Sequence, residues 1–383
     1  IQMAAQLSPA DTIEPKPPAQ WRLIGQAVNR VDIPAKVDGT AQFGIDVRLP
    51  GMKFASVMLC PTLGGELDTL DAQELIRRPG VDKVVTLPPL AGTSGGFAVV
   101  ASHTWTANQA TLAAKPTWRH GASETVSTIT IMNELDRALR DDDGFSFYSL
   151  GDADAAFEAA PNKVDVSYQM PHLAHATLEP MNATAWFHDD VLEVWAPTQV
   201  PGLAAMAAAN AAGLESEQVR LHTTLLGGGF GRRLETDYVA VAATIAMAMP
   251  GTPVQTVWSR EQDMTHDFYR PAQVVQLQAG VSANGKWNAV KIRSAGDSVV
   301  AGWMNRSLPI PGGGPDKTTA EGLFDQAYGV PNQSMRHITT SVGVPIGFWR
   351  AVGHSISGFI MESFVDEVAD ALGQDPVAYR LSL

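Results

Sequence analysis

The sequence predicts an α+β fold that is divided into at least two domains. The chain has 383 residues, which is more than one ordinary hydrophobic core accommodates. Hydrophobic residues make up 45% of it and charged residues 17%, a balance typical of folded globular proteins. Its 34 glycines and 25 prolines indicate many turns, which favours mixed strands and helices over a helix bundle.

Residues 1–20 predict a proline-rich linker without amphipathic period, and a first α+β domain is expected over residues 21–120. Apolar runs between turn residues predict its strands, at residues 41–47, 53–60, 81–87 and 97–102. Helical patterns cover residues 71–78 and 105–114.

Residues 121–150 predict a polar connector with one helix that ends in an acidic run, and residues 151–383 predict a second domain. The acidic run at 141–143 is interpreted as a solvated helix end, with a metal site as the weaker alternative. Further strands are expected at residues 163–171, 183–188, 191–196, 219–226, 253–259 and 274–283, and helices at 201–212, 234–249 and 355–372. Residues 303–314, which include Pro309 and Pro311, predict a long irregular loop, either at a site entrance or on the ordinary surface.

Composition excludes several classes of function. A formal net charge of −13 argues against nucleic acid or an anionic membrane surface as the main partner. The apolar runs are too short to span a bilayer. Cys60 is the only cysteine, so the chain cannot close an internal disulfide or hold an iron–sulfur cluster by itself. We expect Cys60 to be a buried small hydrophobic residue rather than a nucleophile.

A glycine-rich loop lies between a predicted strand and a predicted helix. It consists of Gly227, Gly228, Gly229, Phe230, Gly231 and Arg232, followed by Arg233. Backbone N–H groups at a helix start, without Cβ atoms in the way, can bind an anion, and two arginines add positive charge. A dinucleotide fingerprint would need glycine at Arg232, and the sequence has no P-loop lysine. A tight structural connection with solvent-facing arginines remains the alternative.

Together with three further segments, this loop resembles the xanthine dehydrogenase and aldehyde oxidase family. The segment from His175 to Glu179 resembles the family's His-x-x-x-Glu stretch, and Thr198-Gln199 resembles its Ser/Thr-Gln segment. The run Phe348-Trp349-Arg350-Ala351-Val352-Gly353 resembles its Phe-Arg-Gly-Phe-Gly loop. The resemblance covers about residues 20–383. It implies an α/β-hammerhead domain at 21–120 and, at 151–383, the first part of a molybdopterin-binding domain of the aldehyde oxidase type.

Within the family, the sequence looks most like the branch of isoquinoline 1-oxidoreductase β subunits and membrane-associated bacterial aldehyde dehydrogenases. Leu234 stands where xanthine enzymes have a glutamate, and Val352 where they have a stacking phenylalanine. The resemblance therefore implies an aldehyde or an N-heterocycle as substrate rather than a purine.

The resemblance also implies roles for individual residues. Gln199 and Arg350 are expected to be catalytic, Gln199 by hydrogen bonding to an oxygen ligand of molybdenum and Arg350 by supplying positive charge. The cofactor is expected to contact Gly227, Gly228, Gly229, Phe230, Gly231, Arg232, Gln199 and Arg350. No protein side chain is expected to bind the metal directly.

The cofactor that the resemblance implies is molybdopterin cytosine dinucleotide. The implied partners are a small subunit with 2Fe-2S clusters and a cytochrome c subunit. The branch implies a periplasmic location, with membrane association through partners and a cytoplasmic location left open. The start, Ile1-Gln2-Met3, has neither an initiator methionine nor a charged-then-apolar signal pattern, and is interpreted as that of a processed or excised product.

The family's general base is a glutamate in a Gly-x-Gly-Glu loop, and this sequence contains no such loop. The resemblance therefore implies that the chain alone is inactive. A non-catalytic module that keeps the fold and binds no cofactor is the alternative. His172 and His175 invite a zinc hypothesis, but no third ligand stands at a convincing spacing. A serine hydrolase is not indicated either, because no Gly-x-Ser-x-Gly motif occurs.

Overall fold

The computed structural model describes residues 8, 12–308 and 310–383, and their secondary structure is α+β, as predicted. The chain divides into a small unit, Ile1–Gln42, and a large unit, Phe43–Leu383. The described part of the small unit contains a 3-10 turn, η2 (Pro18–Gln20), and a short helix, α1 (Ile33–Asp38). Half of the predicted linker, residues 1–7 and 9–11, lies outside the described residues.

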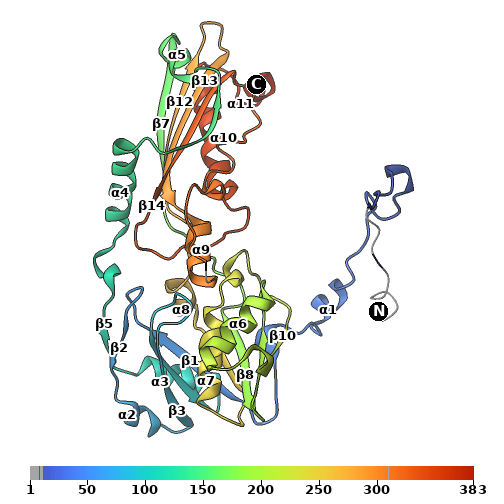
Figure 1. Ribbon diagram of the computed structural model, residues 1–383, viewed down its shortest axis with the longest axis vertical. Helices are drawn as coiled ribbons and strands as arrows, with labels where there is room; N and C mark the ends of the chain where they lie inside the picture. The colour runs from blue at the N-terminus through green and yellow to red at the C-terminus, as the bar shows by residue number, and fades with distance from the viewer. Residues whose placement is uncertain (1–7, 9–11, 309) are drawn as a thin grey trace. The chain divides into compact units, whose positions relative to one another are not determined.

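A seven-stranded mixed sheet forms one end of the large unit (Figure 1). Its strands, in spatial order, are β10 (Val219–Thr223), β9 (Val191–Ala196), β8 (Asn182–His188), β11 (Val254–Val257), β1 (Lys53–Leu59), β4 (Gly96–Ala101) and β3 (Val81–Leu87). Strands β1 and β11 pair in parallel, with Lys53 opposite Val254. The segments predicted as separate domains therefore share one sheet, because this pairing joins strands about 200 residues apart.

Alanine-rich helices cover one face of this sheet. Helix α6 (Pro201–Ala212) begins at a proline and ends at Gly213, which has the left-handed φ of 66° that a C-cap glycine adopts freely. Helix α7 (Asp237–Met247) is buried along almost its whole length. Their small side chains allow close packing on the sheet, in a core with Leu192, Val194 and Ala185.

The remaining elements of this half lie around β1 and β4. Helix α3 (Thr104–Leu112) packs on both strands, next to α2 (Ala72–Ile76) and a two-stranded ribbon of β2 (Glu66–Thr69) and β5 (Thr117–Arg119). Cys60 follows β1 and is fully buried, and burial raises the pKa of its thiol. The prediction of a buried, unreactive cysteine is confirmed.

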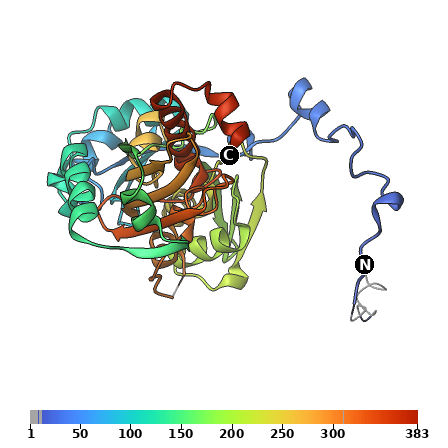
Figure 2. The same ribbon diagram turned by 90° about the horizontal axis from the view of Figure 1, so that it is seen from above.

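A five-stranded sheet forms the other half of the large unit. Its order is β6 (Phe145–Leu150), β14 (Asn332–Thr340), β13 (Trp287–Asp297), β12 (Gln273–Val281) and β7 (Asn162–Met170). Helix α10 (His354–Ala371) packs Ile360 and Phe364 against one face, and α4 (Thr128–Asp141) packs Leu135 against the other. Figure 2 shows the red helices α10 and α11 (Pro376–Ser382) together beside this sheet. Helix α5 (Ala153–Glu158) also contacts β12 and β13.

Two expectations about local structure were wrong, and some strands were missed. Residues 41–47 form no strand: Gly44–Asp46 is a 3-10 turn, η3, and only Phe43 makes an isolated bridge, to Leu225. The first part of the expected loop at 303–314 belongs to helix α9 (Val299–Ser307), which Ser298 caps; Pro309 lies outside the described residues. Strands β6, β13 and β14 were not predicted, because polar and apolar residues do not alternate regularly in them.

Short elements complete the large unit. They are helix α8 (Arg260–Thr265) and the 3-10 turns η4 (Ala122–Thr125), η5 (Ser216–Gln218), η6 (Arg232–Leu234) and η7 (Lys317–Thr319).

Among the residues described, no helix has the length and apolar character needed to cross a membrane.

His337 makes the stability of this fold depend on pH. Its ring lies in β14 with 1% of its surface exposed, and Nδ1 is 2.7 Å from the Ser294 hydroxyl. Burial lowers the pKa of His337 to about 4. In the unfolded chain the pKa of His337 is about 6.5. Between this pH and pH 4, His337 is therefore protonated in the unfolded state but stays neutral in the folded state. The fold therefore loses stability as the pH falls from 6.5 toward 4.

We expect the unfolding free energy of the wild type to fall by about 2 kcal/mol more than that of His337→Gln between pH 7 and pH 5. Denaturant titrations at the two pH values measure this difference. His103→Gln, at an exposed histidine, serves as a control and should keep the wild-type pH dependence. Parallel pH profiles for the wild type and His337→Gln would contradict the prediction.

Candidate functional site

Two loops and one glutamine side chain line an open cavity of about 560 Å³ in the large unit. Its lining residues come from the glycine loop, the segment after β9 and the loop before α10: Gln199, Leu226, Gly228, Gly229, Phe230, Gly231, Leu234, Phe348, Trp349, Arg350, Ala351 and Val352. Most residues expected to contact a cofactor are thus brought together, although they are up to about 150 positions apart in the sequence.

The glycine loop follows β10 and adopts a conformation that glycine allows. Gly228 and Gly231 have φ values of 101° and 110°, and Phe230 between them has a φ of 55°. The loop lies between a strand and a helix, as predicted. It is not the helix N-terminus itself, however, because η6 intervenes and α7 begins only at Asp237. Any anion here would be bound by loop N–H groups rather than by a helix end.

The donors of this loop fall into two groups. Gly227 donates its N–H to Glu179 Oε2 at 2.8 Å, and Gly231 donates to Gln199 Oε1 at 3.2 Å. Within the described part of the chain, the N–H groups of Gly228, Gly229 and Phe230 have no acceptor. Unpaired donors at a cavity wall favour a ligand rich in oxygen or nitrogen acceptors.

The glycine loop also has no room for side chains at Gly229 and Gly231. A Cβ atom at Gly229 would lie 2.5 Å from Gln199 Oε1, and one at Gly231 would lie 1.7 Å from the carbonyl oxygen of Phe348. The glycines therefore allow the two loops and Gln199 to approach each other closely. This arrangement fits a planar group with several acceptors, such as a pterin.

Gln199 is held so that its amide nitrogen remains available. Its backbone N–H donates to the carbonyl of Arg233 at 3.0 Å, and its Oε1 accepts from Gly231. Because Oε1 is engaged, Nε2 is the group that can donate into the cavity.

Arg350 lies on the opposite loop. Its N–H donates to the Phe230 carbonyl at 2.7 Å, which ties the two loops together. Arg350 is exposed and lines the cavity, and among the residues described no carboxylate forms an ion pair with it. The next two residues, Ala351 and Val352, have left-handed φ values of 68° and 43°. Such values cost about 1–3 kcal/mol each in residues other than glycine, and are typical of functional sites.

Arg232 corrects the sequence prediction. Its guanidinium is buried, donates to both carboxylate oxygens of Asp237 at 2.9 and 2.8 Å, and does not line the cavity. Its Nε is 3.0 Å from Asp267 Oδ1, an ion pair without hydrogen-bond geometry. Both carboxylates thus hold the guanidinium in the core, away from the cavity. The alternative of solvent-facing arginines is wrong for the same reason.

Arg233 is also buried and supports the loop from behind. Its Nε donates to the Gly228 carbonyl at 2.8 Å, and Nη2 donates to the Glu179 carbonyl at 2.8 Å and contacts its Oε2 at 3.2 Å. Glu179 in turn accepts from the N–H of Gly227. Gly227 therefore does not line the cavity either; its N–H is used to fix the loop.

His175 and Asp267 form a contact that sequence reasoning missed. His175 Nδ1 lies 3.0 Å from the Asp267 carboxylate, and Nε2 lies 2.9 Å from the Phe348 carbonyl. Burial opposes ionisation of Asp267, but the hydrogen bond from His175 and the charge of Arg232 outweigh it and lower the pKa of Asp267. The His-x-x-x-Glu pattern indicated that His175 was of interest, but gave no hint of its partners.

His172 faces different surroundings. Burial and the nearby charge of Arg270 lower the pKa of His172 to about 4. Its ring packs edge-on to Tyr269, whereas His175 stacks on Trp349. Among the described residues no three His, Cys, Asp or Glu side chains converge as metal ligands. The two histidines therefore do not form a common site.

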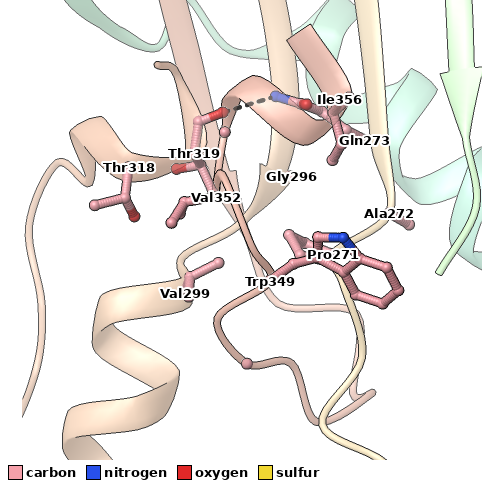
Figure 3. Close-up of a pocket in the computed structure, with 12 residues that line it drawn as sticks. Pro271, Ala272, Gln273, Gly296, Val299, Thr318, Thr319, Trp349, Val352 and Ile356 are labelled. Carbon is pink, nitrogen blue, oxygen red and sulfur yellow. Dashed lines mark hydrogen bonds between the residues drawn. The ribbon is translucent and has the colours of Figure 1, made fainter. Parts of the chain in front are cut away.

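A second, enclosed cavity lies behind the loop that carries Arg350 (Figure 3). It is lined by Pro271, Val299, Trp349, Val352 and Ile356, among others, and its volume of about 10 Å³ accommodates about one water molecule. Trp349 and Val352 line both cavities. This loop is therefore the wall between the open cavity and the core.

Residues 140–382 match the family model of the molybdopterin cofactor-binding domain, and the chain belongs to this family. It is 31% identical to a membrane-bound aldehyde dehydrogenase (pyrroloquinoline-quinone) of Gluconacetobacter polyoxogenes over 96% of this chain and 49% of that protein. It is 30% identical to the isoquinoline 1-oxidoreductase subunit beta of Brevundimonas diminuta over 94% and 46%, respectively. The chain spans about half the length of these relatives. The branch inferred from the motifs is confirmed.

Solved structures with a similar fold were also found. The aldehyde oxidoreductase from Desulfovibrio desulfuricans superimposes with a TM-score of 0.71 over 95% of this chain and 44% of that chain, at 21% identity. The chain thus shares the fold of part of this aldehyde oxidoreductase.

Proposed function

We propose that this chain contributes part of the molybdenum site of a hydroxylase that oxidises an aldehyde or an N-heterocycle with oxygen derived from water. One observation carries the proposal: Gln199, Arg350 and three loop residues whose N–H groups have no acceptor among the described residues, Gly228, Gly229 and Phe230, line one cavity in a molybdopterin-family fold. When bound, the cofactor supplies the oxidation chemistry that amino-acid side chains lack.

The cavity residues support distinct roles. The N–H groups of Gly228, Gly229 and Phe230 bind acceptor atoms of the cofactor. Gln199 Nε2 donates to an oxygen close to the reacting centre and fixes its orientation. Arg350 stabilises negative charge that develops on the substrate. Leu234 gives the cavity an apolar patch, which suits an apolar aldehyde or aromatic ring better than a purine with its several polar groups.

Further features rest on the branch resemblance. We propose molybdopterin cytosine dinucleotide as the cofactor form. A single cysteine cannot hold a 2Fe-2S cluster, so electrons would leave through a small 2Fe-2S subunit and, in this branch, a cytochrome c subunit. A periplasmic location belongs to the same proposal.

We also propose that these 383 residues are inactive by themselves, because they contain no Gly-x-Gly-Glu loop for the general base. Hydroxylase turnover by the 383-residue chain alone, loaded with molybdenum, would contradict this.

The cofactor proposal is tested on the full-length natural protein, purified with its partners. We expect about one molybdenum per protein by elemental analysis and a pterin fluorescence spectrum after oxidative release. A protein with neither would favour the non-catalytic alternative. Release of a quinone in place of pterin would instead favour the cofactor in the name of the Gluconacetobacter relative.

A further inference from the structure

We propose that His175 is a positioning residue, which holds the loop 348–352 so that Arg350 faces the open cavity. The effect of His175 on catalysis rests on the proposed function. Its restraint of the loop rests only on the contacts that His175 makes.

The contacts of His175 are all directed to this loop or to the support behind it. The side chain is 1% exposed. Nε2 is 2.9 Å from the Phe348 carbonyl, which can only accept, so Nε2 donates to it. The imidazole ring also stacks on the Trp349 indole, with centroids 4.6 Å apart and planes 24° from parallel. His175 thus contacts the two residues immediately before Arg350.

A buried charge network orients the histidine. Asp267 contacts Nδ1 at 3.0 Å and also accepts from the backbone N–H of His175. Arg232 pairs with Asp267 at 3.0 Å and with Asp237. Since Arg232 belongs to the end of the glycine loop, the network links both walls of the cavity through the core. A carboxylate that fixes the orientation of an imidazole is a common arrangement behind functional groups.

The loop needs such a restraint because its own backbone is strained. Ala351 and Val352 both have left-handed φ values, which cost about 1–3 kcal/mol each. Among the residues described, the Phe348 carbonyl accepts a hydrogen bond from His175 alone. Within the same residues, the one hydrogen bond of Arg350 is that of its N–H to the Phe230 carbonyl. Without the His175 donor, relaxation of the strained turn would move Arg350.

Two substitutions test the contributions of the two ring nitrogens of His175 separately. In His175→Gln the amide nitrogen reaches about as far as Nε2 and can still donate to the Phe348 carbonyl. In His175→Asn the amide reaches only as far as Nδ1 and can contact Asp267 but not the loop. Both are neutral amides next to Asp267, so they differ in reach rather than in charge.

The first readout is trypsin cleavage after Arg350, followed by mass spectrometry on the full-length natural protein. We expect His175→Asn to be cut there at least about 10-fold faster than the wild type, and His175→Gln within about 3-fold of it. His222→Phe is the control, because His222 stacks on Trp195 in the same way, at 4.7 Å, but contacts Glu193 on an exposed strand. It should leave cleavage at Arg350 unchanged. Equal cleavage of the Asn variant and the wild type would overturn the proposal.

The second readout is steady-state turnover of the loaded enzyme. We expect His175→Asn to lower kcat about 10-fold with KM changed less than about 3-fold and with unchanged molybdenum content, and His175→Gln to restore most of kcat. A loss of molybdenum in step with activity would show a merely structural role and contradict the proposal. Should the enzyme prove to contain no molybdenum, the proposed function fails while the cleavage experiment still decides the role of His175.

Discussion

Gly231→Ala is expected to destroy the cavity and to be the most damaging single substitution in the glycine loop. The new Cβ would lie 1.7 Å from the Phe348 carbonyl oxygen and 2.6 Å from its carbon, both rigid backbone atoms. In addition, a φ of 110° is open to glycine and unfavourable for alanine. The two loops would have to separate, at a cost on the order of 3–5 kcal/mol. Molybdenum content of the full-length protein should fall to background.

Gly358→Ala is the matched control. Gly358 lies in α10, has nothing within 4 Å of its ideal Cβ position, and does not have a positive φ. Alanine there should raise the unfolding free energy by about 0.5–1 kcal/mol, because it lowers the entropy cost of the helix. Thermal unfolding and elemental analysis of both variants provide the comparison. Full molybdenum content in Gly231→Ala would mean that the loops do not meet as described.

Arg232→Met is expected to lower the unfolding free energy by about 3–5 kcal/mol. The substitution keeps an apolar side chain of similar length but leaves Asp237 and Asp267, which are 0% and 2% exposed, without their shared cation. Buried carboxylates without a partner are costly, and much of the penalty comes from the charge left behind. Urea titrations of the variant and the wild type measure the difference.

Two further variants make this result specific. Arg137→Met removes an exposed arginine that pairs with Glu134 on the surface of α4, and should cost less than about 1 kcal/mol. The double variant Arg232→Met/Asp237→Leu should recover part of the loss, because it removes one of the two stranded charges. If Arg232→Met were as stable as Arg137→Met, Arg232 would have to be solvated, and it could then face a cofactor after all.

The sequence was sufficient for the regular parts of the fold. Strands such as β1, β4 and β9 and helices α6 and α10 carry strong apolar patterns, and were predicted within a few residues of their bounds. What it could not reveal is long-range pairing. The parallel contact between β1 and β11 joins the first domain to the second, and no local pattern encodes the partner of a buried strand.

The candidate site, too, could be predicted from the sequence only in part. Gln199, Arg350 and the glycines were found through their motifs, and all of them except Gly227 lie around one cavity. Their chemical roles remain predictions. Arg232 was misplaced because an arginine next to glycines resembles a phosphate ligand, whereas its position depends on Asp237 and Asp267, which only the folded chain brings close. The partners of His175, Asp267 and the Phe348 carbonyl, were missed for the same reason.

The most direct test of the central claim is a crystal structure of the full-length natural protein with its cofactor, recorded at the molybdenum absorption edge. We expect one anomalous peak in the cavity lined by Gln199, Phe230 and Arg350, with pterin density against the N–H groups of Gly228 and Gly229. A molybdenum peak elsewhere, with this cavity filled only by solvent, would contradict the assignment of the site.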